Sequence, residues 1–505
     1  MPAKTLMIQG TASSVGKSII VAGLCRIFRQ DGFKVAPFKA QNMALNSFVT
    51  KEGGEIGRAQ AVQAEAAGIE PSVYMNPVLL KPEAEASSQV IVLGKVAKSL
   101  EASQYYNHTP NLLKIIEDSL NRLRSTYDIV VIEGAGSPAE INLKKREIVN
   151  MRVAKMANAP VLLVGDIDRG GVFASLIGTL ELLTKLERNL IKGFIINKFR
   201  GDLKLLKPGL DILEKRTGKP VLGVIPYFRG IAIAQEDSVY LDERPGNSHN
   251  GSIDVAVIRL PHISNYDDFD PLEEQDCTVR YVTRASELGN PDLLILPGTK
   301  STIADLIYLQ QQELAQAIIH RSKSGTAIIG ICGGYQILGK SIHDPDKVES
   351  KHDSIAGLGL LNSTTIFNHA KTTTQVKAQV AADEGLLKGL KGIEVTGYEI
   401  HMGQTRSQNC QPVFQILETP QGRADYFDGA VNSNGFIFGT YIHGLFHNAN
   451  FTHRLLNRLR QLRGLPIISA PSTNKQEKYD KLASIIRQNL DMSQVYKITF
   501  GRNYG

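Results

Sequence analysis

The stretch Thr326-Ala-Ile-Ile-Gly-Ile-Cys-Gly-Gly-Tyr-Gln-Ile-Leu-Gly339 decides the fold of the C-terminal half of this chain. Its apolar start, Ala327 to Ile331, predicts a buried strand of an α/β sheet. Cys332 ends that strand, and the two glycines after it permit a sharp turn into a helix. A side chain on such a turn projects from the sheet, and the helix N-terminus behind it favours a thiolate. The pattern is equally compatible with a nucleophile and with a small buried cysteine.

A thiolate nucleophile needs a base within hydrogen-bonding distance. Among the eleven histidines, His443 is the best candidate, because it ends an apolar run that starts at Phe436 and is followed by glycine. We therefore predict that Cys332 and His443 form a catalytic pair. The backbone amides of Gly298, in a Pro-Gly-Thr turn after another apolar run, and of Gly333 are predicted to stabilise an oxyanion.

A second site is predicted at the N-terminus. The apolar run Thr5 to Gln9 leads into a glycine-containing loop, Gly10 to Ser18, and an amphipathic run, Ile19 to Gln30, follows. This order is typical of a phosphate-binding loop, in which amides and a lysine surround phosphates and a hydroxyl binds Mg²⁺. Five residues separate the two glycines of the loop, where the usual pattern has four. The predicted ATP-binding residues here are Gly10, Thr11, Ser14, Val15, Gly16, Lys17 and Ser18.

Further apolar runs in the N-terminal half end in polar residues. The carboxyl ends of parallel strands meet at one edge of a sheet, where such folds bind their ligands. Glu133 ends the run that follows Asp128 and is predicted, with Ser18, to bind Mg²⁺ directly or through water. Two acids and an arginine at another strand end could instead be mutually satisfied ion pairs. The predicted residues around the activated carboxylate are Lys39, Gln41, Asn42, Asp166, Asp168 and Arg169.

Bulk composition limits the classes of function. The chain has 505 residues, of which 42% are hydrophobic and 21% charged, as expected for a soluble protein with more than one domain. Its net charge of +7 is scattered, so a nucleic-acid partner is not indicated. The four cysteines lie far apart, which argues against disulfides and zinc sites and favours a reducing cytoplasm. No apolar run is long enough to span a membrane.

The pattern along the chain predicts an α/β fold with four parts. Residues 1–231 form the P-loop domain with a parallel sheet, and the acidic, turn-rich residues 232–252 form a linker. Residues 253–449 form a second α/β domain around the cysteine turn. Residues 450–505 are predicted as a helical tail that packs on the protein or forms a homo-oligomer.

Two of these motifs resemble known families. The variant P-loop is similar to that of dethiobiotin synthetase and its relatives, which activate carboxylates with ATP, and Asn197 is similar in position to a residue that contacts the base. Cys332 with the distant His443 resembles a class I glutamine amidotransferase domain. The usual family glutamate, two residues after the histidine, is Leu445 here. This departure matches the cobalamin-pathway subgroup and leaves open what orients His443, for which Glu399 is a candidate.

The two domains in this order resemble the cobyric acid synthase family over about residues 4–490. The motifs that carry this resemblance are Gln41–Ser47, Asp166–Ser175 and Gly397–Gly403. The resemblance implies ATP-, Mg²⁺- and glutamine-dependent amidation of the b, d, e and g carboxylates of the corrinoid adenosylcobyrinic acid a,c-diamide in cobalamin biosynthesis. The alternatives are a cobyrinic acid a,c-diamide synthase and a P-loop regulatory ATPase with an inactive amidotransferase domain.

Overall fold

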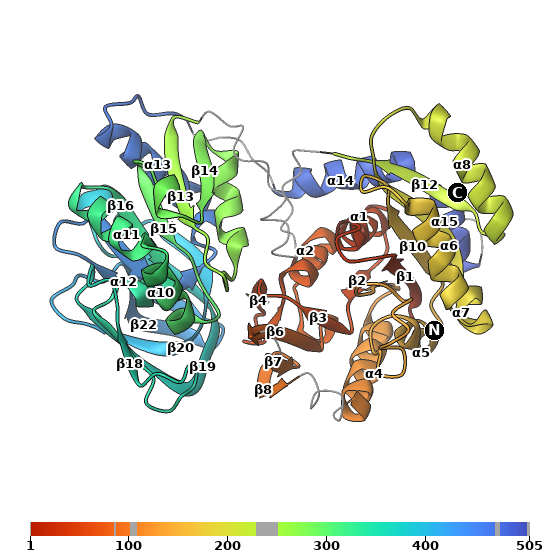
Figure 1. The fold of residues 1–505 in the computed structure, drawn as a ribbon, viewed down its shortest axis with the longest axis horizontal. Helices are drawn as coiled ribbons and strands as arrows, with labels where there is room; N and C mark the ends of the chain where they lie inside the picture. Colours follow the sequence, from red (N-terminus) through yellow and green to blue (C-terminus); the bar gives the residue numbers. More distant parts are fainter. Residues whose placement is uncertain (1, 85–86, 102–108, 229–250, 470–474, 502–505) are drawn as a thin grey trace. The chain divides into compact units, whose positions relative to one another are not determined.

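The computed structural model describes residues 2–84, 87–101, 109–228, 251–469 and 475–501, which form two compact units (Figure 1). Most of the predicted linker, residues 232–250, lies outside the described residues. Unit 1 comprises Met1–Ala44, Glu55–Asp237 and Thr473–Gly505, and unit 2 comprises Leu45–Gly54 and Ser238–Ser472.

Unit 1 is built on a sheet of six parallel strands in the order β12-β11-β10-β1-β9-β2. Its central strands are apolar on both faces, as expected for a parallel sheet covered on both sides. The predicted α/β class is thus confirmed for this half of the chain. The strands are β1 (Lys4–Gly10), β2 (Val35–Phe38), β9 (Ile129–Glu133), β10 (Val161–Asp166), β11 (Ile191–Phe199) and β12 (Val221–Pro226).

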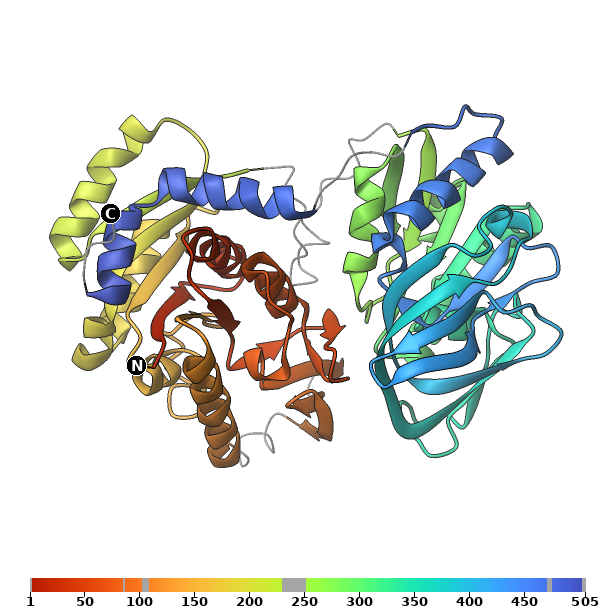
Figure 2. The same ribbon diagram turned by 180° about the vertical axis from the view of Figure 1, so that it is seen from behind.

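Helices cover both faces of this sheet. Leu6 and Ile8 of β1 join the core on the face of α1, whereas Met7 between them joins the core on the opposite face. The first face is covered by α1 (Lys17–Gln30), α14 (Lys475–Asn489) and α15 (Met492–Phe500) (Figure 2). The helices that contribute to the opposite core are α4 (Thr109–Thr126), α5 (Met151–Ala157), α6 (Val172–Leu182) and α8 (Leu203–Thr217).

The remaining elements of unit 1 lie between these strands in sequence. A four-stranded sheet has the order β3-β6-β7-β8 and carries Gln41 and Asn42 on its first strand. Helix α2 (Arg58–Ala67) follows β5 (Glu55–Gly57), and α7 (Lys185–Leu190) precedes β11. The strands of the small sheet are β3 (Gln41–Met43), β6 (Val78–Ala84), β7 (Ser87–Val92) and β8 (Lys95–Glu101).

The predicted C-terminal tail is divided between the units. Helix α13 (Ala449–Leu462) buries Phe451 and Leu455 in the core of unit 2. Helix α14 instead buries Leu482 and Ile486 in the core that α1 lines in unit 1. The predicted boundary at residue 450 therefore differs from the structure, because the apolar face of each helix belongs to a different core.

Unit 2 contains two sheets. The first has the order β14-β13-β15-β16-β24-β23 and is parallel except for β23, so the predicted α/β class is also confirmed here. Its strands are β13 (Ile253–Ile258), β14 (Cys277–Val282), β15 (Leu293–Leu296), β16 (Ala327–Ile331), β23 (Ala430–Val431) and β24 (Ile437–Thr440). The helical elements beside it include η3 (Tyr266–Glu274), α10 (Thr302–Gln311), α11 (Leu314–Lys323) and α12 (Gly333–Leu338).

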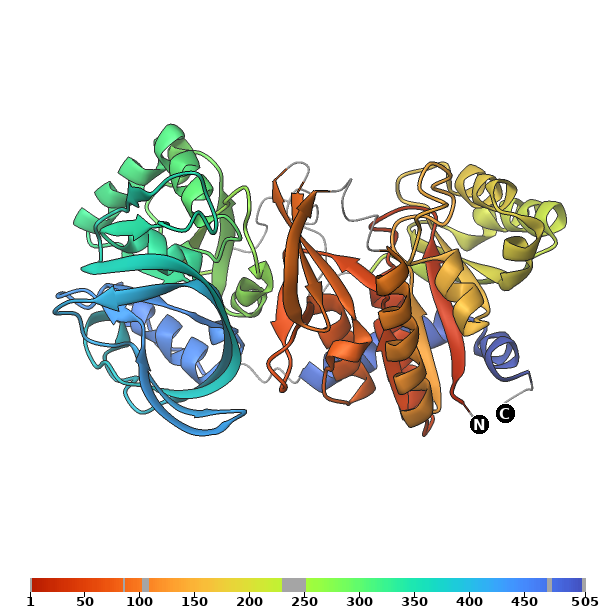
Figure 3. The ribbon, with the colours of Figure 1, turned by 90° about the horizontal axis from the view of Figure 1, so that it is seen from below.

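The second sheet of unit 2 is strongly curved (Figure 3) and has the order β18-β17-β19-β20-β25, with β21 and β22 extending from β19. The chain passes directly from β24 in the first sheet to β25 in the second, so the residues of β25 lie where the sheets meet. The strands are β17 (Ser341–His343), β18 (Ser354–Ala356), β19 (Ser363–Val380), β20 (Glu394–Ser407), β21 (Phe414–Thr419), β22 (Gly422–Asp428) and β25 (Ile442–His443).

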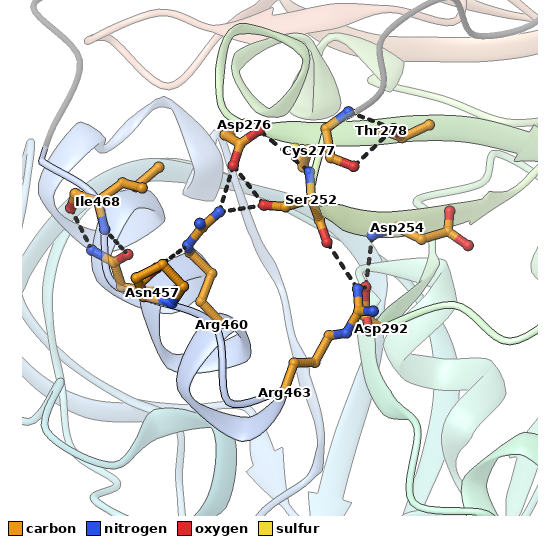
Figure 4. Close-up of polar contacts among 12 residues, drawn as sticks. Ser252, Asp254, Asp276, Cys277, Thr278, Asp292, Asn457, Arg460, Arg463 and Ile468 are labelled. Carbon is orange, nitrogen blue, oxygen red and sulfur yellow. Dashed lines mark hydrogen bonds and ion pairs between the residues drawn. The ribbon is translucent and has the colours of Figure 1, made fainter.

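Arg460 of α13 and Arg463 just after it contact residues that directly precede β13, β14 and β15 (Figure 4). The buried Arg460 contacts the side chains of Ser252 and Asp276. Arg463 Nη1 donates to the Ser252 carbonyl at 2.8 Å and to Asp292 Oδ2 at 2.9 Å. These contacts join the C-terminal end of α13 to the segments that lead into β13, β14 and β15. They therefore stabilise the fold of unit 2.

The four cysteines of the chain are all free thiols. Burial raises the pKa of Cys25, and it raises the pKa of Cys277 to about 12, which keeps both protonated as small apolar side chains. None of the described helices is both long and apolar enough to cross a membrane.

Candidate active sites

The predicted strand, turn and helix around Cys332 are present in unit 2. Strand β16 ends at Ile331, Cys332 has a φ of 52°, and α12 begins at Gly333. A positive φ is a strained conformation for a residue with a side chain, and such strain is concentrated at functional sites. Gly334 permits the turn, because a Cβ there would lie 2.0 Å from the Leu296 carbonyl oxygen.

His443 lies beside Cys332, as the catalytic-pair prediction requires. Cys332 N donates to the Thr440 carbonyl at 2.8 Å, which joins the cysteine turn to the chain just before β25. Cys332 is close enough to raise the pKa of the His443 imidazole, which is only 1% exposed, and the Cys332 thiol donates to the Ile400 carbonyl at 3.5 Å. A Cβ on Gly298 would lie 2.8 Å from His443 Cε1, so the turn there can approach the ring only because it carries a glycine.

Asp268 orients the ring of His443. His443 Nδ1 lies 2.7 Å from Asp268 Oδ2, and the Gly444 amide donates to Asp268 Oδ1 at 2.7 Å. Both side chains are buried. An Nδ1–H held by a carboxylate selects the tautomer and leaves Nε2 available for proton transfer. Cys332, His443 and Asp268 therefore have the arrangement of a catalytic triad.

The sequence did not reveal Asp268. This residue lies 175 positions before His443, in the 3-10 segment η3, within an acidic cluster that also contains Asp267 and Asp270. Glu399, the candidate proposed for this role, accepts instead a hydrogen bond from the Tyr426 hydroxyl at 2.7 Å. The only signal in the sequence was a run of aspartates, which does not show which of them faces a histidine.

Two neighbours of His443 offset the effect of its burial on its pKa. Burial alone would lower the pKa of His443, but the Asp268 carboxylate and Cys332 together raise it to about 10. His443 is therefore protonated at neutral pH, and an imidazolium stabilises a neighbouring thiolate. A cysteine nucleophile reacts as its thiolate, so a cationic histidine beside it would favour attack on a carbonyl carbon.

The turn that contains Gly298 is held by Asp305 of α10. Asp305 is fully buried and accepts hydrogen bonds from the Thr299 hydroxyl at 2.5 Å and from the His262 amide at 3.2 Å. A Cβ on Gly333 would lie 3.1 Å from the Thr299 amide nitrogen, so the two predicted oxyanion segments are adjacent. The structure thus brings the backbone of both segments to the cysteine turn.

The phosphate-binding loop of unit 1 connects β1 and α1 as predicted. Helix α1 begins at Lys17, after Gly16 with a φ of 100°. Lys17 Nζ donates to the carbonyl oxygens of Ala12 at 2.8 Å and Gly136 at 3.3 Å, which places its charge within the loop. Backbone amides at the start of this 14-residue helix, together with the lysine, provide an anion site.

Glu133 is the centre of a buried polar network at the end of β9. Its Oε1 accepts hydrogen bonds from Ser18 Oγ at 2.8 Å and Lys39 Nζ at 3.0 Å, and Oε2 accepts from Gln63 Nε2 at 2.5 Å. Burial alone would raise the pKa of Glu133, but Lys39 and these hydrogen bonds hold it below its usual value. The glutamate is therefore ionised. The sequence did not indicate Gln63, because a glutamine on a helix has no distinguishing pattern.

The other predicted residues of unit 1 have defined partners. Asp166 Oδ2 lies 2.8 Å from Lys198 Nζ, and Asp168 Oδ1 lies 3.0 Å from Arg200 Nε. Both acids thus pair with basic residues in β11 or just after it, which differs from the mutual pairing of these acids with Arg169 that the sequence suggested as the alternative. Arg169 lies in the turn between β10 and α6.

Two predicted site asparagines contact neighbouring elements of unit 1. Asn197 Nδ2 donates to the Val15 carbonyl at 2.8 Å, and a Cβ on Gly16 would lie 2.0 Å from the same nitrogen. Asn197 therefore lies directly against the phosphate-binding loop. Asn42 Nδ2 donates to Gln60 Oε1 at 2.9 Å, which joins the small sheet to α2.

Three glutamine atoms in unit 1 are buried without a hydrogen-bond partner among the described residues, namely Gln9 Oε1, Gln60 Nε2 and Gln63 Oε1. A buried polar atom that lacks a partner costs about 1–3 kcal/mol of stability. Gln60 contacts Asn42, and Gln63 contacts Glu133 and the Ser18 carbonyl. Gln60 and Gln63 are therefore direct neighbours of predicted site residues.

Comparison with known proteins identifies the family. The model of the CobQ/CobB/MinD/ParA nucleotide binding domain matches residues 6–239, and that of the CobB/CobQ-like glutamine amidotransferase domain matches residues 254–451. The chain is 62% identical over 496 residues to a cobyric acid synthase of Dehalococcoides mccartyi, and this alignment covers 98% of the chain and 99% of that relative. The chain belongs to the cobyric acid synthase family.

Other cobyric acid synthases match over similar lengths. That of Thermoanaerobacter sp. is 52% identical over 506 residues, which is 98% of both chains, and that of Sorangium cellulosum is 52% identical over 514 residues, or 99% of both. The predicted family is therefore confirmed. The chain is an enzyme, a glutamine amidotransferase and ligase of cobalamin biosynthesis with a nucleotide-binding domain.

Proposed function

We propose that this member of the cobyric acid synthase family uses ATP and glutamine to amidate the b, d, e and g carboxylates of adenosylcobyrinic acid a,c-diamide. The observation that carries the proposal is the Cys332–His443–Asp268 arrangement, in a chain that also has a predicted phosphate-binding loop before α1. A regulatory ATPase with an inactive partner domain has no use for such a triad.

The triad supports hydrolysis of glutamine to glutamate and ammonia. The Cys332 thiolate attacks the carboxamide carbon, while the amides of Gly298 and Gly333 stabilise the oxyanion. His443 gives its proton to the departing ammonia, and a γ-glutamyl thioester remains on the cysteine. Water deprotonated by His443 then attacks the thioester carbon, which releases glutamate and restores the thiol.

The phosphate-binding unit supports activation of the acceptor. A carboxylate is a poor acyl donor, so we infer that one of its oxygens attacks the γ-phosphorus of ATP, giving an acyl phosphate and ADP. Lys17 and the helix N-terminus neutralise the phosphates, and Asn197 supports the loop that surrounds them. Ammonia attacks the acyl carbon, phosphate leaves, and the amide loses a proton to solvent. Lys39, Gln41, Asn42, Asp166, Asp168 and Arg169 are the residues proposed for the acceptor and its phosphorylated form.

The residues around Glu133 are suited to Mg²⁺. The Ser18 hydroxyl and Glu133 carboxylate are hard oxygen donors, and the unpartnered Gln63 Oε1 lies on the residue that binds Glu133. We infer that Ser18 and Glu133 hold the ion, with the nucleotide phosphates and water as its other ligands. Within the described ranges no cluster of three or more acidic, histidine or cysteine side chains is placed to bind a metal. A bound Mg²⁺ would neutralise charge on the phosphates.

The remaining partners follow from this chemistry. We infer that glutamine, ATP and the corrinoid are the ligands and that the enzyme works in the reducing cytoplasm, which suits its four free thiols. Helices α13 and α14 bury their apolar faces in the two cores, so these faces are not the surface through which a homo-oligomer would form.

Cys332→Ser tests the division of labour. Glutamine-dependent amidation should fall by about 10³-fold or more, since a serine lacks the nucleophilicity of a thiolate, while high ammonium chloride still supports ATP-dependent amidation. Loss of the ammonium-dependent activity in a folded variant would overturn the proposal. Amidation of cobyrinic acid at its a and c carboxylates by the wild-type enzyme would instead indicate the sister activity.

A further inference from the structure

A short segment from the N-terminal half of the chain belongs to the amidotransferase unit. Leu45–Gly54, which includes β4 (Ser47–Val49), is part of unit 2, whereas the residues before and after it belong to unit 1. Asn46 and Ser47 of this segment are fully buried. Polar residues that are buried in this way require hydrogen-bond partners. Here the partners are residues that contact His443 or belong to the segment that carries Asp268.

The first group of contacts involves Tyr398 of β20. Its hydroxyl donates to the Ser47 carbonyl at 3.1 Å and accepts from Asn265 Nδ2 at 2.8 Å. Phe48 packs edge-on against the Tyr398 ring, with 5.6 Å between ring centroids. The other side of this tyrosine stacks on the imidazole of His443 at 5.5 Å, with 18° between the planes. The segment therefore fixes the position of the Tyr398 ring, which stacks on the His443 imidazole.

The second group of contacts involves the start of η3. Asn46 Oδ1 accepts a hydrogen bond from the Tyr266 amide at 2.9 Å. Asn265, just before it, has a φ of 53° and also donates to the Ser47 carbonyl, at 3.4 Å. The same short 3-10 segment carries Asp268, the partner of His443 Nδ1. The segment is thus bonded to the elements that hold both sides of the histidine.

We propose that Leu45–Gly54 is a positioning element of the glutaminase. It acts through Tyr398 and Tyr266, which hold His443 and Asp268 in the geometry that produces the thiolate. The inference rests on the proposed roles of Cys332, His443 and Asp268. Gln41 and Asn42, which are proposed for the acceptor site, lie just before this segment in the sequence and belong to unit 1.

Two variants of the full-length chain test this role. Tyr398→Phe keeps the ring on His443 but removes the bond to Ser47, and Asn46→Ala removes the acceptor for the Tyr266 amide. Each should lower kcat for glutamine hydrolysis by about 10-fold, the effect of one misplaced catalytic hydrogen bond, with little change in KM. Ammonium-dependent amidation should stay within about 2-fold of wild type. Alkylation of Cys332 by iodoacetamide should require a higher pH, because a displaced His443 stabilises the thiolate less.

Tyr426→Phe is the matched control, since the Tyr426 hydroxyl binds Glu399, the neighbour of Tyr398 on β20. This variant should leave kcat and the alkylation profile unchanged. If Tyr398→Phe and Asn46→Ala lower only the thermal unfolding midpoint, the segment merely packs and the positioning role is wrong. If the wild-type enzyme itself has no Cys332-dependent glutaminase activity, the proposed function is wrong instead.

Discussion

The two candidate sites are assembled in different ways. In unit 1, Glu133 and the phosphate-binding loop lie at the ends of neighbouring strands of one parallel sheet, and Lys39 follows the next strand along. In unit 2, Cys332 comes from one sheet and His443 from another, while Asp268 lies on an irregular segment. Strand order alone accounts for the first site, whereas the second depends on how separate elements pack.

The sites also differ in the charge that they maintain. Lys39 keeps Glu133 ionised in spite of burial, which prepares an anion for a cationic ligand. Asp268 keeps His443 protonated in spite of burial, which prepares a cation for a thiolate. Because each site has its own buried ion pair, substitutions should separate phosphoryl transfer from glutamine hydrolysis. The first two of the following four predictions test this separation, and the other two concern the stability of unit 2.

The largest effect is expected for Lys17→Ala, which removes the cation from the phosphate-binding loop. Amidation should fall by about 10³-fold with either glutamine or ammonium as the nitrogen source, because the charge on the transferred phosphate is no longer neutralised. ADP release measures the loss. Iodoacetamide alkylation of Cys332 should be unchanged, and an altered alkylation rate would show that the sites are not independent.

A smaller effect is expected for Asp268→Asn, which removes the carboxylate from His443. Glutamine hydrolysis should fall by about 10²-fold, while ammonium-dependent amidation stays near wild type. The control is Asp267→Asn, since Asp267 lies 3.7 Å from His447 Nε2. Equal losses in both variants would mean that the overall negative charge of η3, and not the pairing of Asp268 with His443, supports the reaction.

The raised pKa of His443 predicts a pH dependence of stability. Its usual value of 6.5 is raised to about 10 in the folded protein, so this stabilisation is complete below pH 6.5 and is lost as the pH rises through 10. Calorimetry should find the wild type more stable than Asp268→Asn by about 2–4 °C near pH 6, with a smaller difference at pH 10. A difference that does not change with pH would argue against a charged histidine.

The smallest effects concern the scaffold of unit 2. Arg460→Met should destabilise the folded protein by about 1–2 kcal/mol in urea unfolding, because Asp276 and Ser252 lose a buried donor. The half-exposed Arg463 should contribute less than about 1 kcal/mol when changed to Met. Both variants should keep the glutaminase kcat/KM of the folded enzyme, and its loss would show that α13 also supports the triad.

Residues at strand ends could be read from the sequence because their signals are local. An apolar run followed by glycine and a polar residue specifies a parallel strand and the turn that exposes its last side chain. The turn at Cys332, the loop around Lys17 and the ends of β9 and β25 were all found on this basis. The tail was less predictable, since an amphipathic pattern shows that α13 and α14 have apolar faces but not which core receives them.

The sequence alone was sufficient for the α/β class and the family resemblance, and it predicted a nucleophile and its histidine, since each of these depends on short-range patterns. Only the tertiary structure identified Asp268 as the partner of His443 and Gln63 as a hydrogen-bond donor to Glu133. It also showed that Leu45–Gly54 is part of the amidotransferase unit. The reason is physical. These residues lie on irregular segments or on a polar helix face, where no periodic pattern indicates direction, and their partners are set by packing between parts of the chain far apart in sequence.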